Sequence, residues 1–387
     1  MNVVILSPHF PPNYYNFCVQ LHWLGVTVLG IADEPYDLLR PELQAVLTEY
    51  YRVDDMHNYD QLLRACGYLI HRHGRIDRFE SHNEYWLETD ARIRTDFNIP
   101  GIKDDGISAI RLKSRMKERF QQAGVATARW HEVTTLPQAR RFATKAGYPI
   151  VAKPDGGVGA AATFKIHDDE ELQAFFAQKP DVAYIMEEFV DGTICTFDGL
   201  TDRAGNPVFY TSHEYSQGVM ETVNEQLDIY YYSQRAIPRD LEEAGRRTLK
   251  AFDVRERFFH FEFFRTPHDG GLVGLEVNMR PPGGLTMDMF NYANDIDLYR
   301  EWAHIVAHNR FTAKYSRPYH CCFAGRRMHK HYAHSHQDVV RSLGSHLVHH
   351  EPINSTFGVA LGDYGYLFRT RDLDQVHELA GYILELA

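Results

Sequence analysis

The sequence predicts an α/β protein that begins with a doubly wound parallel sheet and continues into further sheet-containing domains. Apolar runs at 3–7 and 26–32 flank a helical segment at 14–23, and such strand–helix–strand units with short connections are typical of a parallel sheet. A chain of 387 residues also exceeds what one hydrophobic core usually holds, so we expect two or three domains.

The remaining elements follow from apolar periodicity and from turn residues. In the first half we expect helices at 59–73 and 108–124 and strands at 76–80, 149–154, 163–166 and 182–190. The second half adds strands at 193–202 and 207–212, a helix at 239–252 and a strand pair at 258–284; strand, helix, two strands and helix then follow after 310. The predicted domains are 1–107, 108–310 and 311–387.

Composition narrows the possible partners. The chain has 41 basic and 52 acidic residues, a net charge of −11, which argues against a nucleic-acid or anionic-membrane surface. It has no apolar run of 18 residues and no signal-peptide pattern at its start. The 5 cysteines form no CxxC pair, which favours buried thiols in a reducing cytoplasm.

The strand pair at 258–284 carries the strongest chemical pattern. A turn at Pro267–Gly271 separates two runs, and strand side chains alternate between faces. In the second strand one face holds Glu276, Asn278 and Arg280, and the other holds Leu275, Val277 and Met279. In the first strand one face holds His260, Glu262 and Phe264, and the other holds Phe259, Phe261 and Phe263.

If the two polar faces coincide, two carboxylates crowd one small surface, which is costly unless something neutralises them. Mg²⁺ does so well, because it prefers carboxylate oxygens together with nucleotide phosphates. The alternative is a solvated polar face on which Glu and Arg simply pair, and the pattern alone favours neither.

A glycine-rich loop follows the strand at 149–154. Gly156, Gly157 and Gly159 allow the backbone to approach a ligand closely, and Lys153 could hold a phosphate as a point charge. No Gly-Lys-Ser/Thr follows, so the loop is not a Walker A motif. A flexible hairpin is the structural alternative.

Other candidates are weaker. Ser81 to Glu84 follows a predicted strand, where ligands of open α/β sheets bind, although a polar loop that caps a helix explains it equally well. The first turn lacks a glycine fingerprint, which disfavours a dinucleotide-binding oxidoreductase. Lys113 and Lys117 lie one helical turn apart, and such pairs usually face solvent. The histidine-rich run 320–336 fits no zinc motif and is expected to be a surface strand and loop.

Five segments follow one another along the chain: LKSRMKERFQQAGV, IVAKPDGGVGAAA, MEEFVDG, FHFEFF and LEVNMRPPGG. In this order they resemble the ATP-grasp superfamily over about residues 108–310. The chain looks most like its carboxylate–amine ligases, a group that includes L-amino acid ligases and relatives of biotin carboxylase. The resemblance implies an amino-terminal pre-ATP-grasp domain, a two-lobed ATP-grasp with a mobile lobe at about 126–187, and a small carboxyl-terminal subdomain.

The resemblance also implies roles for single residues. Lys113 and Lys153 match the lysines that contact nucleotide phosphates, and Gly156 to Ala161, including Gly159 and Ala160, match the loop that covers them. Glu187, Glu188 and Val190 match the adenine hinge, with Glu188 and Val190 acting through backbone groups. Glu262, Glu276 and Asn278 match the Mg²⁺ or Mn²⁺ ligands, and Arg280 matches the group that steadies an acyl phosphate.

Two departures from the family pattern are visible. Ala160 to Ala162 stand where the loop often has a serine, and Asp198 does not clearly match the acidic residue that contacts ribose. The acid substrate is expected near Arg280, Gly283 and Gly284 and extends toward Glu84, whereas His260 and His213 are weak candidates for the proton acceptor.

The expected activity is ADP-forming ligation of a small-molecule carboxylate to an amine. The alternatives are a carboxylase or another acceptor in the same superfamily, and a nucleotide-binding module without chemistry. The sequence does not determine the substrates or the oligomeric state, for which a homodimer is the commonest case.

Overall fold

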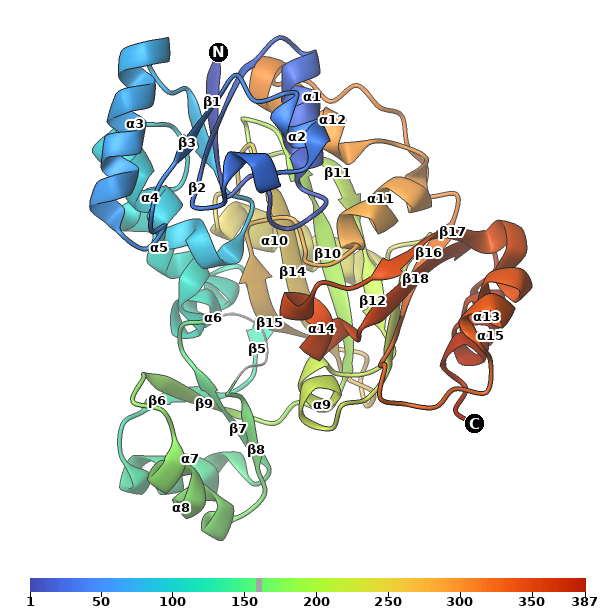
Figure 1. Cartoon of the computed structure of the whole chain (residues 1–387). Coiled ribbons are helices and arrows are strands. Elements are labelled where there is room, and N and C mark those ends of the chain that lie inside the picture. The colour runs from blue at the N-terminus through green and yellow to red at the C-terminus, as the bar shows by residue number, and fades with distance from the viewer. Residues whose placement is uncertain (158–161) are drawn as a thin grey trace.

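The computed structural model describes residues 1–157 and 162–387, and these residues form three sheets with helices packed on them (Figure 1). The first sheet is parallel and has the order β3-β2-β1-β4. Its strands are β1 (Asn2–Leu6), β2 (Thr27–Ala32), β3 (Glu49–Arg52) and β4 (Arg78–Glu80). Its helical segments are α1 (Tyr15–Trp23), η1 (Tyr36–Leu38), α2 (Pro41–Gln44), α3 (Tyr59–His73), η2 (Glu84–Trp86) and α4 (Leu87–Asp96).

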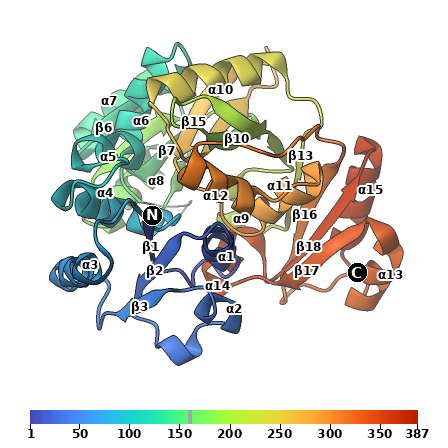
Figure 2. The same cartoon turned by 90° about the horizontal axis from the view of Figure 1, so that it is seen from above.

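Alternate side chains of β1 enter two different cores. Val3 and Ile5 pack with α1, whereas Val4 and Leu6 pack with α3 on the opposite face. The predicted doubly wound parallel sheet is therefore confirmed, and Figure 2 shows its helices from above.

The predicted single helix at 108–124 is wrong. α5 (Asp104–Arg111) ends before Leu112, which is extended with φ −98° and ψ 121°, and α6 (Lys113–Gln122) then begins. At the break, the Asp155 carboxylate accepts hydrogen bonds from the Ser114 N–H at 2.7 Å and from Ser114 Oγ at 2.8 Å, and the Asp155 carbonyl accepts one from the Lys113 N–H at 2.8 Å. Asp155, which is distant in sequence, thus satisfies donors at the start of α6.

The second sheet, together with α7 and α8, forms a small lobe at residues 130–188, below the rest of the chain in Figure 1. Its strands pair antiparallel in the order β6-β9-β7-β8. They are β6 (Trp130–Val133), β7 (Ile150–Pro154), β8 (Phe164–Ile166) and β9 (Tyr184–Glu188), and the helices are α7 (Leu136–Ala146) and α8 (Asp169–Gln178). Ala139, Ile150 and Leu172 are fully buried in the core between these layers.

The third sheet has 10 strands along the path β17-β18-β16-β13-β12-β10-β14-β15-β5, with β11 paired to β10. They are β5 (Ala126–Thr127), β10 (Thr193–Thr201), β11 (Pro207–Thr211), β12 (His213–Tyr215), β13 (Ile229–Ser233), β14 (Phe258–Arg265), β15 (Leu272–Asn278), β16 (His320–Arg326), β17 (Leu347–Pro352) and β18 (Tyr364–Thr370). The associated helices are α9 (Val219–Asn224), α10 (Arg239–Ala251), α11 (Thr286–Asn294), α12 (Leu298–His308), α13 (His336–Leu343), η3 (Gly344–His346), α14 (Ser355–Leu361) and α15 (Leu373–Leu384).

The carboxyl-terminal strands extend this same sheet, because β16 pairs with both β13 and β18. The predicted order of strand, helix, two strands and helix after 310 is present, with the short helix α14 added between β17 and β18. The division into domains at 107 and 310 stays a prediction.

Candidate functional site

A cavity of about 600 Å³ lies between the small lobe, α6, α9 and the β14–β15 hairpin. Many of the residues predicted from the sequence line it, namely Lys113, Lys153, Glu187, Glu188, Val190, Glu262 and Glu276. These residues come from segments that are far apart in the sequence. The fold thus brings most of the predicted nucleotide and metal residues to one place.

The hairpin places its two carboxylates side by side. Glu262 pairs with Glu276 in the β14–β15 register, and His260 pairs with Asn278, so the polar faces coincide as predicted. The apolar face of the hairpin is buried, with Phe261 and Val277 fully inaccessible. The Lys113 ammonium lies 3.5 Å from Glu276 Oε1 and donates to the Gly157 carbonyl at 3.2 Å.

Leu275 does not join the apolar face as predicted. The register shifts next to Glu262, so that Glu262 pairs with Glu276 while Phe263 pairs with Gly274. This β-bulge leaves Leu275 as the extra residue, and its side chain lines the cavity with Glu276. Apart from Gly274, the sequence contains no signal that predicts the bulge.

The buried lysines Lys113 and Lys153 line the cavity, and a third buried lysine, Lys117, contacts the lining residue Glu187. Lys117 was expected to face solvent, but it is only 1% exposed. The Glu187 Oε1 atom lies 3.1 Å from Lys117 Nζ and 2.8 Å from Lys153 Nζ. Burial opposes ionisation of Glu187, but these two ammonium groups hold the pKa of the carboxyl below its usual value. Burial also lowers the pKa of Lys117.

The cavity wall also includes the apolar side chains of Val151, Ile194, Met220, Phe264 and Leu275, together with the charged residues Lys165, Asp191 and Glu221. Among the described residues the Val190 N–H donates no hydrogen bond. The N–H of Glu188 is occupied, because it donates to the Arg129 carbonyl at 2.9 Å, and its side chain accepts from Arg129 as well. The wall suits a flat apolar ring with a polar edge near the backbone of residues 188–190.

A buried network lies behind Glu262. The Asp198 carboxylate, which is fully buried, binds the Nδ1 atoms of His260 at 2.6 Å and His213 at 2.8 Å. His260 then contacts Glu262 Oε1 through Nε2 at 3.0 Å. Burial opposes the imidazolium charge, but Asp198 and Glu262 raise the pKa of His260 to about 10. Asp198 is therefore not placed to contact a ribose.

Arg280 turns toward the amino-terminal sheet. Its Nε donates to Glu84 Oε2 at 3.0 Å, and its Nη2 contacts both Glu84 and the Asn278 amide oxygen. Arg111 Nη1 lies 3.4 Å from Glu84 Oε1. The structure thus brings together Glu84, Asn278 and Arg280, three residues predicted for the metal and acid sites.

Gly283 and Gly284 lie against α14. A Cβ atom built on Gly283 would meet Phe357 at 3.2 Å, and one on Gly284 would meet Leu361 at 2.5 Å. Gly284 also has φ +62°, which favours glycine. The backbone conformation thus favours glycine at 284, and both residues lie in contact with side chains of α14.

The comparisons with known proteins agree on the fold. No profile of a known protein family matches the chain. An L-arginine-specific L-amino acid ligase from Bacillus subtilis is 24% identical over 258 residues, which cover 64% of this chain and 62% of that protein. The chain thus matches less than two thirds of that relative's length.

The solved structure of an L-amino acid ligase from Bacillus licheniformis superposes with a TM-score of 0.73 at 14% identity, covering 100% of this chain and 98% of that one. The chain has the ATP-grasp fold. N5-carboxyaminoimidazole synthetase from Staphylococcus aureus gives a TM-score of 0.71 at 14% identity, covering 99% and 97%. The biotin carboxylase domain of Hydrogenobacter thermophilus 2-oxoglutarate carboxylase gives 0.71 at 14%, covering 97% and 88%.

The loop of this ATP-grasp fold is described only in part. Gly156 forms a bridge to Leu112, and Gly157 has φ +127°, a conformation that glycine adopts readily. The predicted residues Gly159 and Ala160 lie outside the described residues, as does the rest of 158–161.

Two features outside the main cavity bear on the predictions made from the sequence. Within 1–157 and 162–387, no cluster of three or more His, Cys, Asp or Glu side chains could hold a metal ion. The expectation of a surface strand in the histidine-rich run is wrong, because β16 lies inside the third sheet between β13 and β18 and Cys321 to Arg326 are buried. The residues 328–336 that follow are exposed or half-buried. Across the part of the chain that the structure describes, no helix is long and apolar enough to cross a membrane.

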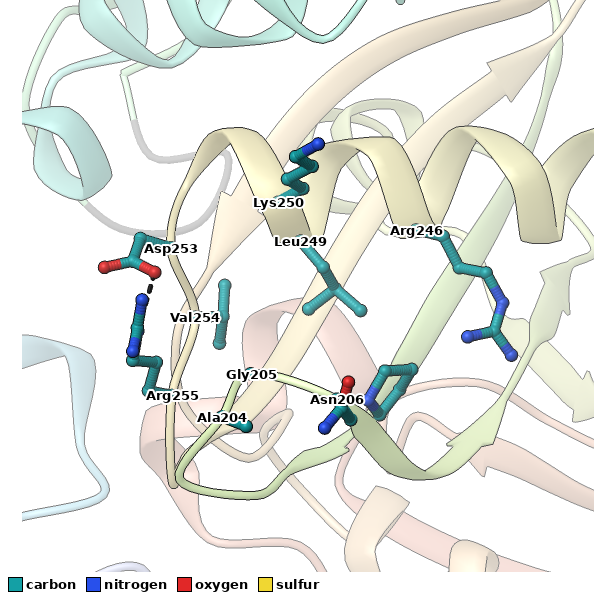
Figure 3. Close-up of a pocket in the computed structure, with 10 residues that line it drawn as sticks. Ala204, Gly205, Asn206, Arg246, Leu249, Lys250, Asp253, Val254 and Arg255 are labelled. Carbon is teal, nitrogen blue, oxygen red and sulfur yellow. Dashed lines mark hydrogen bonds and ion pairs between the residues drawn. The ribbon is translucent and has the colours of Figure 1, made fainter.

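A second hollow of about 360 Å³ lies between the β10–β11 turn and the end of α10 (Figure 3). Two of its basic side chains already have acidic partners, since Arg255 pairs with Asp253 and Arg246 with Glu242. None of the predicted site residues is among the described residues that line it.

Proposed function

We propose that the protein is an ATP-dependent, ADP-forming ligase that activates a carboxylate as an acyl phosphate and joins it to an amine. The observation that carries this proposal is the pairing of Glu262 with Glu276 at the cavity that Lys113 and Lys153 also line. Two facing carboxylates beside two ammonium groups fit a magnesium nucleotide better than a solvated polar face, because all four side chains are at least four-fifths buried.

The nucleotide would lie along the cavity. Lys113 and Lys153 would hold phosphate oxygens, and the wall formed by Ile194, Phe264 and Leu275 would cover the base. The Val190 N–H and the Glu188 carbonyl would contact the edge of the base. The Hydrogenobacter neighbour was solved with MgADP and bicarbonate, which supports a nucleotide site in this fold.

The residues present also fit Mg²⁺. Glu262 and Glu276 offer carboxylate oxygens and Asn278 an amide oxygen, and Mg²⁺ commonly combines one or two carboxylates with substrate phosphates. When bound, Mg²⁺ would neutralise negative charge on the phosphate oxygens during transfer. The His260–Asp198 pair would fix the orientation of Glu262, since His260 contacts Glu262 at 3.0 Å.

The reaction has two steps. A carboxylate oxygen of the acid attacks the γ-phosphorus, and the bond between that phosphorus and the ADP oxygen breaks, with Lys153 stabilising the transferred charge. The amine nitrogen then attacks the acyl carbon, the carbon–oxygen bond to phosphate breaks, and the proton that the nitrogen loses passes to the departing phosphate. Arg280 would stabilise the oxyanion between these events.

Neither histidine considered from the sequence suits the role of proton acceptor. His260 keeps its proton at neutral pH, because its pKa is raised to about 10 despite its burial. His213 is only 1% exposed, and its Nδ1 is already bound to Asp198. Both are better explained as supports for the metal-binding strands.

The test is an ADP-release screen over amino acids and small carboxylates, singly and in pairs, with bicarbonate as a separate arm. Release that requires an acid and an amine together supports ligation. Release with bicarbonate alone would indicate a carboxylase instead, and absence of ATP turnover with every pair would contradict the proposal. Glu276→Gln is the inactive control.

A further inference from the structure

Arg327, the residue after β16, is a buried cation whose side chain joins two helices. It is 6% exposed, and its guanidinium donates to four backbone carbonyls. Those of Leu227 and Val359 lie at 2.9 Å, and those of Thr222 and Gly358 at 3.4 Å. No carboxylate among the described residues forms an ion pair with it, so the carbonyls alone compensate for burial of the charge.

The carbonyls belong to two different segments. Thr222 lies in α9 and Leu227 in the turn after it, whereas Gly358 and Val359 lie in α14. The planar guanidinium therefore holds each segment with two hydrogen bonds, which a lysine ammonium does not reproduce with the same geometry. Helices α9 and α14 also touch directly.

The two segments contact different parts of the proposed active site. The start of α9 lines the nucleotide cavity through Val219, Met220 and Glu221. No described residue of α14 lines that cavity; its Phe357 and Leu361 pack on the Gly283–Gly284 turn that follows Arg280. Phe357 also stacks on Phe10 of the amino-terminal domain, with ring centroids 5.8 Å apart and an interplanar angle of 5°.

We propose that Arg327 is a positioning residue that couples the nucleotide site to the Gly283–Gly284 turn, where the acid substrate is expected, by joining α9 to α14. The inference rests on the proposed function, because it takes the cavity to be a nucleotide site. Ordering of α9 by a nucleotide restrains α14 through the guanidinium, and α14 in turn restrains Gly283 and Gly284. An acid substrate then meets a turn that is already in place, which lowers the entropy cost of its binding.

The test is amide hydrogen exchange of the full chain with and without saturating MgADP. In the wild type, MgADP should slow exchange in both 219–224 and 355–361, the latter by at least about fivefold, the lower end of ordinary coupling energies. In Arg327→Met, MgADP should still slow exchange in 219–224 but change 355–361 less than about twofold. Arg327→Lys, which keeps the charge, should behave in the same way.

Arg326→Met is the matched control. Arg326 is adjacent and similarly buried, but its guanidinium donates to the carbonyls of Ile383 and His334, which belong to neither α9 nor α14. This variant should keep MgADP protection in both segments.

Two results would overturn the coupling alone. In the first, MgADP still protects 355–361 in Arg327→Met and Arg327→Lys. In the second, the wild type binds MgADP but 355–361 gains no protection. Failure of the wild type to bind MgADP would overturn the nucleotide site, and with it the proposed function.

Discussion

The cluster of Lys117, Lys153 and Glu187 makes a sharp prediction about stability. Helix α6 supplies Lys117, whereas strands β7 and β9 of the small lobe supply the other two residues. Both ammonium groups contact the same Glu187 oxygen, at 3.1 and 2.8 Å, so the two nitrogen atoms are at most about 6 Å apart. The Glu187→Gln substitution would leave two buried cations facing each other without a carboxylate.

The size of the effect follows from these distances. Two positive charges about 6 Å apart at an effective dielectric constant of about 20 repel by roughly 3 kcal/mol. Breaking a buried ion pair by removing one partner commonly costs about 3–5 kcal/mol. Lys117→Met should cost at most about 2 kcal/mol, because Glu187 and Lys153 remain as a neutral pair.

The double variant Lys117→Met/Glu187→Gln should therefore be more stable than Glu187→Gln alone by about 3 kcal/mol, since it removes the repulsion. The assay is urea unfolding followed by tryptophan fluorescence, because Trp130 pairs with Glu187 across β6 and β9. Glu188→Gln is the control; its ion pair with Arg129 is partly exposed and should be worth less than about 1 kcal/mol. A double variant that is less stable than Glu187→Gln would refute the reasoning.

Three further predictions test the site and the fold. Glu276→Gln should lower kcat/KM for ATP by about 100-fold or more and raise the Mg²⁺ concentration that half-maximal activity needs. Unchanged ADP release across a Mg²⁺ titration would contradict the role of Glu276. Leu275→Ala should raise the Kd for MgADP about tenfold, measured by calorimetry, because an apolar wall contact is lost; an unchanged Kd would place the base elsewhere. Burial raises the pKa of Asp90 to about 6. The folded state therefore binds this proton more tightly than the unfolded chain does, and the stability that the protonated carboxyl contributes is lost as pH rises from 4 to 6. Asp90→Asn should therefore gain about 3 kcal/mol relative to wild type between pH 4 and 7 in urea unfolding, and parallel pH curves would contradict this.

The hairpin at the centre of the site could be predicted because its information is local. A turn fixes two strands, and period two sorts Glu262, Glu276 and Asn278 onto one face. Leu275 was misplaced because a bulge changes this period without a clear sequence signal.

The errors elsewhere arise from partners that are distant in sequence. Asp155, 41 residues from Ser114, accepts hydrogen bonds at the break in the predicted helix, and the burial of Lys117 depends on Glu187 in another lobe. The Arg280–Glu84 contact joins residues that are 196 positions apart, so it cannot be predicted from composition or residue spacing. The resemblance to ATP-grasp ligases, by contrast, located Lys113 and Lys153 through their order along the chain.

The pairing of β16 with β13 has a consequence for anyone who shortens this protein. Removing residues 311–387 would leave Ile229–Ser233 with a row of backbone donors and acceptors open to water, next to buried aromatic side chains such as Tyr231. Bare strand edges of this kind recruit strands from other molecules. A truncated version should therefore aggregate during expression, and the tail is better kept or replaced by a designed strand.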